Sequence, residues 1–99
     1  MRRAAKVDTN QTAIVRALRK AGCRVLSLAA VGHGCPDLMA CRADQVYLLE
    51  IKDGAKSASR RQLTPLQKQF HADWPVHVVK NEIEALKIIE AALKRGGEA

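Results

Sequence analysis

The chain has few aromatic residues and no long apolar run. Phenylalanine, tryptophan and tyrosine together make up 3% of its 99 residues, which argues against a platform on which single-stranded bases would stack. No apolar stretch approaches the roughly 20 residues that a bilayer-spanning helix needs. The basic N-terminus is not followed by the apolar segment of a secretory signal. These absences predict a soluble, cytoplasmic protein that has no membrane partner.

Paired cysteines are also absent. Cys23, Cys35 and Cys41 do not form a C-x-x-C pair, and their number is odd. In a chain that shows no secretory signal, this argues against a disulfide framework. Small core fillers are the simpler interpretation of cysteines that lie beside apolar residues. The sequence therefore predicts neither a disulfide nor a zinc site.

Charge of one sign is in excess. Lysine and arginine number 17 against 10 aspartates and glutamates, which gives a formal net charge of +7. This excess suits a polyanionic partner, and nucleic acid is the first candidate. A basic protein that is merely soluble fits the charge equally well. The charge alone does not decide between the two.

The length allows one small globular domain. Apolar residues make up 47% of the chain, which favours a packed core over disorder. We expect this domain to span residues 8–95, between a basic N-terminal tail at residues 1–7 and a C-terminal tail at 96–99. A chain this short buries little surface by itself, so that dimerisation would be a natural way to bury more.

Two carboxylates are predicted to meet beside a buried strand. Residues 45–52 are apolar and β-branched and stop at Asp53-Gly54, which is typical of such a strand. Residues 36–41 could pair with it through a turn at 42–44, and this hairpin would bring Asp37 opposite Glu50. Side-chain alternation places Glu50 and Lys52 on one face. Because buried charge is costly unless it is paired or bound to metal, Asp37 and Glu50 predict a site for a hard cation such as Mg²⁺.

The remaining sequence predicts helices on either side of further strands. A helix capped by Asp8, Thr9 or Asn10 should run to about Ala21 and end at Gly22. Residues 24–29 and 76–79 read as strands. Two capping boxes start later helices, one with Thr64 and Gln67, the other with Asn81 and Glu84, and the last helix should end near Arg95. The order α-β-β-β-α-β-α predicts an α/β fold in which helices flank a mixed sheet.

Four stretches together resemble a known nuclease family. They are residues 8–11, the Gly-rich run 31–38 that contains Pro36-Asp37, the run 49–54 that contains Glu50-Ile51-Lys52, and residues 59–67 with their Leu-Thr-Pro-x-Gln element, which Phe70-His71 and Trp74 follow. They resemble the signature of the PD-(D/E)XK nucleases, and in particular the VRR-NUC branch in the small stand-alone form found in phages and prophages. The resemblance covers most of the chain, from residue 8 to 79. It implies a restriction-endonuclease-like core, which agrees with the predicted order of elements.

The resemblance implies a metal-dependent DNA endonuclease. Its cofactor would be Mg²⁺ or Mn²⁺, and no small-molecule cofactor is expected. Asp37 and Glu50 would hold the ion, with the backbone carbonyl of Ile51 as a third ligand. Lys52 would orient the attacking water or stabilise the phosphate. Taken singly, Asp37 could instead cap a turn, and Glu50 and Lys52 could form an ion pair on the strand.

Two further positions match the family but have structural alternatives. Gln67 would point into the site, although its place in a capping box already gives it a structural role. Asp8 matches the first-helix region, where relatives often carry a glutamate that assists metal binding, and Gln11 lies one turn on. Asp8 could equally be a simple N-cap.

Basic residues after the strand pair are the expected contacts to the DNA backbone. They are Lys56, Arg60 and Arg61, which could also form a solvated loop. His33, between two glycines beside Asp37, could contact phosphate or remain an exposed loop histidine. The other two histidines, His71 and His77, have no metal-ligand spacing with it.

Stand-alone relatives act as dimers that resolve Holliday junctions, and the resemblance implies the same here. The predicted function is a structure-selective endonuclease that cuts four-way junctions as a homodimer. The alternatives are a flap or nicking nuclease on simpler DNA and a basic DNA-binding module without catalysis. Candidate dimer surfaces are the apolar stripe of the last helix, with Leu86, Ile89 and Leu93, and the region around Phe70 and Trp74, although we expect most of these residues to belong to the core instead.

Overall fold

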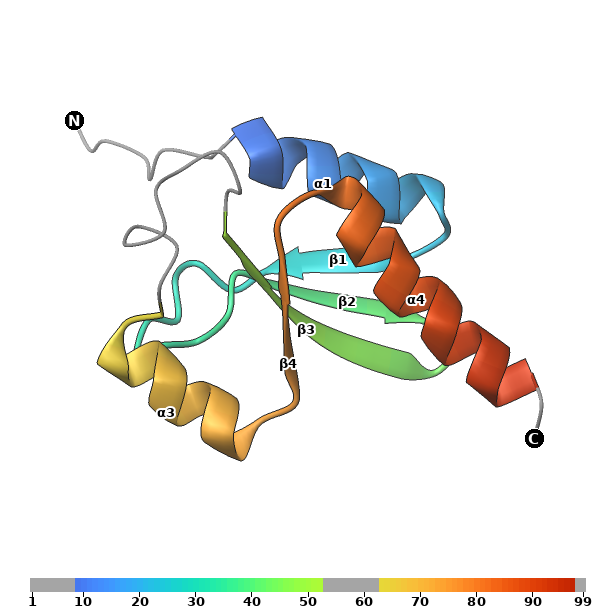
Figure 1. Cartoon of the computed structure of the whole chain (residues 1–99). Helices are drawn as coiled ribbons and strands as arrows, with labels where there is room; N and C mark the ends of the chain where they lie inside the picture. The colour runs from blue at the N-terminus through green and yellow to red at the C-terminus, as the bar shows by residue number, and fades with distance from the viewer. Residues whose placement is uncertain (1–8, 53–62, 98–99) are drawn as a thin grey trace.

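A four-stranded mixed sheet carries the fold. The structure is a computed structural model that describes residues 9–52 and 63–97. In chain order the elements are α1 (Thr9–Lys20), β1 (Arg24–Ser27), β2 (Leu38–Arg42), β3 (Gln45–Ile51), α3 (Pro65–Asp73), β4 (Val76–Val79) and α4 (Glu82–Gly97) (Figure 1). This order confirms the predicted α/β fold. None of the helices in the described part of the chain has the length and apolar character needed to cross a membrane.

The sheet order brings the predicted hairpin to the centre. Strands lie in the order β1-β2-β3-β4; the first three are antiparallel neighbours, and β4 runs parallel to β3. The β2–β3 hairpin turns at Ala43 and Asp44, both with positive φ (52° and 67°), as in the type I′ turns whose twist matches that of paired strands. Leu38 lies opposite Leu49, so Asp37 and Glu50 face each other one step further along.

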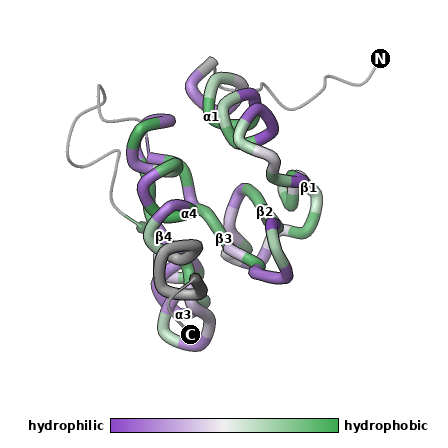
Figure 2. The backbone as a smooth tube through the Cα atoms, turned by 90° about the vertical axis from the view of Figure 1, so that its right-hand side faces the viewer, coloured by the Kyte–Doolittle hydropathy of each residue, from purple (hydrophilic) through white to green (hydrophobic). Residues whose placement is uncertain are grey.

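The core lies between one face of the sheet and two helices. Helices α1 and α4 pack on each other and on the sheet, and in Figure 2 apolar and polar segments alternate along both, as expected for helices with one apolar stripe. The buried apolar residues are Ile14, Leu18, Cys23, Leu38, Ala40, Tyr47, Leu49, Val79, Ala85 and Ile89. Ile89 therefore belongs to the core, as expected for most residues of this stripe, and is excluded as a dimer contact. Leu86 is half-buried against the same core, and the side chain of Leu93 lies outside the described residues.

Helix and strand ends differ from the predictions by a few residues. After β1, the Leu28 amide still donates to the Asp37 carbonyl (2.8 Å), but the Leu28 carbonyl accepts from Val31 (3.0 Å). The chain therefore turns, and β1 ends at Ser27 instead of Ala29. Helix α4 extends to Gly97, past the predicted end near Arg95.

The capping predictions for α3 and α4 have different outcomes. The box of Thr64 and Gln67 is complete. At α4, the Glu84 amide donates to Asn81 Oδ1 (2.9 Å), but the Glu84 carboxylate accepts from the Lys80 amide (2.8 Å) rather than from that of Asn81. The second capping box is therefore incomplete: the Glu84 carboxylate binds the amide one residue before the N-cap residue Asn81.

The second face of the sheet has exposed apolar side chains. By alternation it carries Leu26 of β1, Val46 of β3 and Val78 of β4, whose exposed fractions are 56%, 61% and 45%. We call these three residues the open sheet face. Glu50 of β3 is four residues after Val46, so it lies on the same face, and Lys52, directly after β3, continues this face at its end. The sequence predicted the alternation of β3 but not which face the helices cover.

The loop between β1 and β2 positions α3. Gly34 has φ +81°, and a Cβ atom at this position would meet the Leu66 carbonyl and lie 2.9 Å from the Gln67 amide nitrogen. The Gly34 backbone thus lies directly against the first turn of α3. This close approach is the reason for a glycine here, and it positions the turn that carries Gln67.

Replacing Gly34 with alanine should destabilise the protein more than the same change at Gly32. Gly32 also has positive φ (+74°), but a Cβ there would meet nothing within 4 Å. Gly32→Ala should cost only the backbone term, roughly 1–2 kcal/mol in the free energy of unfolding. Gly34→Ala should add about 1–3 kcal/mol for overpacking against α3. Urea unfolding of both variants measures the difference, and equal values would contradict the proposed contact.

Candidate active site

Asp37 and Glu50 converge where the β2–β3 hairpin ends. Asp37 comes directly before β2, and its Oδ2 accepts a hydrogen bond from the Ile51 amide at 2.7 Å. This bond ties the Asp37 carboxylate to the strand that carries Glu50. The structure therefore brings the two predicted carboxylates together, because the register of two antiparallel strands places their ends side by side.

Glu50 is a buried acid whose oxygens have different partners. Its exposed fraction is 2%. Oε2 accepts from Gln67 Nε2 (3.0 Å) and pairs with Lys52 Nζ at 3.6 Å. Oε1 is buried without a hydrogen-bond partner among the described residues. One oxygen is thus held in place while the other is left for a further ligand.

The surroundings of Glu50 favour its neutral form. Burial raises its pKa from 4.5 to about 7, the nearby Asp37 carboxylate adds to the rise, and the Lys52 ammonium opposes it. A carboxylate that is held ionised under these conditions gains most from a bound cation. The electrostatics of the site therefore suit a positive ion beside Asp37 and Glu50.

Gln67 performs both of the roles that the sequence left open. Its Oε1 accepts from the Thr64 amide at 2.9 Å, as a capping-box residue does, and also from Lys52 Nζ at 3.2 Å. Its Nε2 donates to Glu50 Oε2. The Gln67 amide thus caps α3 and connects Glu50 with Lys52, because its oxygen accepts from the ammonium and its nitrogen donates to the carboxylate.

The first turn of α1 lies at the same end of the sheet. Asn10 Nδ2 donates to the Lys80 carbonyl (2.9 Å), just after β4, and the Lys52 amide donates to the Val79 carbonyl (2.9 Å). Gln11 follows Asn10 in this turn. The first-helix region is therefore near the site, as the resemblance implied. Asp8, however, lies outside the described residues.

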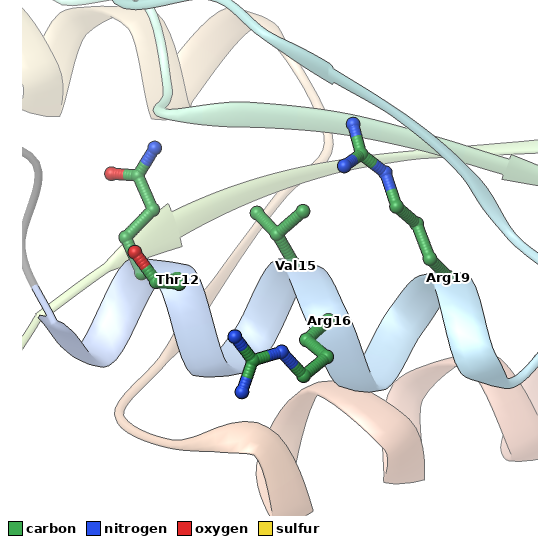
Figure 3. Close-up of a pocket in the computed structure, with 5 residues that line it drawn as sticks. Thr12, Val15, Arg16 and Arg19 are labelled. Atoms are coloured by element: carbon green, nitrogen blue, oxygen red, sulfur yellow. The ribbon is translucent and has the colours of Figure 1, made fainter.

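A groove of about 380 Å³ runs along α1 and carries cationic side chains. The described residues that line it are Gln11, Thr12, Val15, Arg16 and Arg19 (Figure 3). Arg16 and Arg19 are exposed, and Arg19 Nη2 donates to the Val25 carbonyl at 3.4 Å. Sequence reasoning gave these arginines no role. Their spacing of three on a helix was the available signal, since it places both near one side.

The predicted DNA contacts are only partly within the described residues. Lys56, Arg60 and Arg61 lie outside them. His33 is exposed and has φ 58°. It lines a hollow of about 260 Å³ together with Leu66 and other residues of α3 and with Trp74, which directly follows that helix. No hydrogen bond or ion pair between described residues joins His33 to Asp37 or Glu50.

Cys35 and His71 are two further titratable side chains near the carboxylates and the lysine. Cys35 is a free thiol, as are Cys23 and Cys41, and of the three only Cys23 is buried. Burial, followed by the charges of Glu50 and Asp37, raises the pKa of Cys35. Burial and the Lys52 ammonium lower the pKa of His71. Sequence reasoning found no metal-ligand spacing for His71 and assigned it no role in the site, although its spacing of four from Gln67 places both on the same side of α3.

The residues present fit a divalent cation with few protein ligands. Within residues 9–52 and 63–97, no cluster of three or more histidine, cysteine, aspartate or glutamate side chains is arranged to hold a metal. Asp37 and Glu50 offer two carboxylates, and Glu50 Oε1 has no hydrogen-bond partner among the described residues. Mg²⁺ commonly keeps several waters and binds through one or two carboxylates. The donor set thus suits such an ion.

The raised pKa of Glu50 predicts a pH-dependent cost in stability. An acid whose pKa is higher in the folded state binds more protons there, so the free energy of unfolding falls as pH rises from 4.5 to about 7. In the presence of EDTA, Glu50→Gln should be more stable than wild type at pH 8 by up to about 3 kcal/mol. The two proteins should converge near pH 4.5. Urea unfolding across this pH range measures the effect. The control is Glu90→Gln, at an exposed position of α4. If the difference in free energy of unfolding between Glu50→Gln and wild type did not change with pH, the burial argument would be contradicted.

Comparison with known proteins gives one match, to a family. No curated protein and no solved structure matches the chain. The model of the family described as archaeal Holliday junction resolvase (hjc) matches residues 3–99. This span includes Asp37, Glu50, Lys52 and Gln67. The chain therefore belongs to the archaeal Holliday junction resolvase family.

Proposed function

We propose that this protein is a Mg²⁺- or Mn²⁺-dependent endonuclease that resolves four-way DNA junctions as a homodimer. The observation that carries the proposal is the buried Glu50 close to Asp37: Gln67 holds one of its oxygens, and the other has no hydrogen-bond partner among the described residues. Family membership supports junction DNA as the substrate. The net charge of +7 supports binding to a polyanion.

The proposed roles follow from the contacts of each residue. Asp37 and Glu50 would hold the cation, with the backbone carbonyl of Ile51 as the third protein ligand. A bound divalent cation supplies a more acidic water and draws charge from phosphate oxygens. Lys52 has a side chain that is 15% exposed and lies 3.6 Å from Glu50. Its ammonium can donate to an attacking water or to a phosphate oxygen.

Gln67 would keep Lys52 in place when Glu50 binds a cation. The ion pair between Lys52 and Glu50 weakens when the carboxylate shares its charge with a metal. The hydrogen bond from Lys52 Nζ to Gln67 Oε1 does not depend on that charge. The amide therefore gives the ammonium a neutral partner in both states.

The open sheet face supports the homodimer. Leu26, Val46 and Val78 are each between 45% and 61% exposed, and apolar side chains exposed on one face of a sheet can form part of an interaction surface. A second copy could cover this face and place two nuclease sites on one two-fold assembly. Phe70 and Trp74 remain a predicted second surface: their rings stack at 5.4 Å, and Trp74 is 54% exposed. The VRR-NUC branch and a phage or prophage origin also stay predictions.

Removing either charged group of the site should abolish cleavage while leaving junction binding largely unchanged. Asp37→Asn and Lys52→Met should each lower the cleavage rate by at least about 100-fold, because they remove a metal ligand and a transition-state cation. The matched controls are Asp44→Asn in the exposed hairpin turn and Lys87→Met on α4, both of which should cleave like wild type.

Cleavage of a labelled four-way junction, a 5′ flap and a linear duplex, with Mg²⁺, Mn²⁺ or EDTA, measures the outcome. Equal cleavage of all three DNAs would reject junction selectivity, and activity in EDTA would reject the metal.

A charge on the open sheet face should dissociate the dimer. Val46→Lys would place an ammonium on the surface proposed to meet a second copy, where desolvation makes it costly. Ile83→Lys is the matched control, because Ile83 is similarly exposed (64%) but lies on α4. Sedimentation equilibrium should find a dimer for wild type and Ile83→Lys and a monomer for Val46→Lys. A dimeric Val46→Lys protein would place the interface elsewhere.

A further inference from the structure

His71 has a buried nitrogen that no described residue satisfies. Its Nε2 is buried and has no hydrogen-bond partner within the described part of the chain. Leaving such an atom unpaired is costly, and native proteins keep few of them. The other unpaired buried atom assigned to the site is Glu50 Oε1, for which the cation provides a partner. His71 Nε2 needs a partner of a different kind.

The position of His71 connects it to Lys52. His71 follows Gln67 by one helical turn on α3, so both side chains leave the helix on the side that faces β3. Gln67 reaches Lys52 directly, and the Lys52 ammonium is close enough to lower the pKa of His71. The imidazole is thus neutral near pH 7, and a neutral imidazole has one nitrogen that can accept a hydrogen bond.

Packing alone does not explain a histidine here. Helix α3 contributes no fully buried residue to the core, so its position does not depend on an aromatic filler. A leucine or phenylalanine would fill the same space without an unpaired nitrogen. The histidine is therefore better explained by a hydrogen bond that forms when the site is hydrated or occupied.

We propose that His71 is a positioning residue of the nuclease site. Its Nε2 accepts a hydrogen bond from a water molecule that Lys52 also holds. Lys52 Nζ has three donors; one is directed to Gln67 Oε1, a second faces Glu50, and the third is available for this water. A bridging water satisfies the buried nitrogen and fixes the oxygen between a cation and an acceptor. This inference rests on the proposed function, because it assigns the water to the reaction that Lys52 serves.

Three substitutions at His71 separate this role from packing. His71→Gln places an amide near the position of Nε2, His71→Asn places one near Nδ1, and His71→Phe keeps the ring without nitrogen. We expect kcat on a four-way junction to fall about 10–100-fold for the asparagine and phenylalanine variants. The glutamine variant should stay within about 3-fold of wild type, and KM should change little in all three, because the water contributes to orientation rather than to DNA binding. His77→Phe, on β4, is the control and should leave kcat unchanged.

Nuclear magnetic resonance gives a readout that does not depend on activity. The chain has three histidines, so the imidazole nitrogens can be assigned with few substitutions. In the EDTA-treated protein at pH 7, His71 should be neutral with its proton on Nδ1, leaving Nε2 as the acceptor. In Lys52→Met, the Nε2 signal should move and the pKa of His71 should rise. A proton on Nε2 in wild type would overturn the inference.

The two proposals can fail separately. If wild type cuts junctions and Asp37→Asn does not, the proposed function holds. Wild-type kcat in His71→Phe would then overturn only the role of His71. Unfolding in urea shows whether each His71 variant is folded, and the tautomer of the wild-type protein tests the inference even if a variant is not.

Discussion

Burial of Glu50 is the constraint on which the site depends. A carboxyl group that is 2% exposed beside another carboxylate ionises only at a cost. Gln67 and Lys52 offset part of this cost through one oxygen, and the second oxygen has no partner among the described residues. A cation at that oxygen would recover the remainder. Affinity for such an ion and stability of the folded chain would then be linked, because the same carboxylate would determine both.

Helix α3 is held in place mainly by polar contacts. It contributes no fully buried side chain, and its first turn is positioned by Gly34 on one side and by the bonds of Gln67 on the other. The side-chain amide of Gln67 both caps the helix and binds the ion pair of Glu50 and Lys52. A change in the charge of Glu50 would thus alter the hydrogen bonds at the start of α3. The helix that carries His71 would respond to the state of the site, although it lies outside the main core.

The sequence predicted the centre of the site because local rules determine it. The period of two along β3 and the turn at Ala43 and Asp44 fix the register that places Asp37 opposite Glu50. The capping box of α3 could be recognised because Thr64 and Gln67 have the required spacing. Contacts between residues far apart in the chain were harder to predict. The double role of Gln67 and the proximity of His71 to Lys52 depend on how α3 lies on β3, and no periodicity determines that placement.

The same reasoning applies to the dimer surface. An apolar stripe on a helix shows that a face is buried but not which partner buries it, so the sequence left Ile89 of α4 as a candidate dimer contact although the core was the expected place for it, and the structure puts it in the core. For the sheet, the sequence predicts two faces but does not show which of them the helices cover. Val46 and Leu49 lie on opposite faces of β3, and the sequence does not say that α1 and α4 cover only the face of Leu49. Because Glu50 lies on the same face as Val46, the uncovered side of the sheet contains both the site and the apolar surface. A second copy docked there would fix the distance between two sites, so the geometry of paired cuts would be set by the sheet rather than by flexible segments.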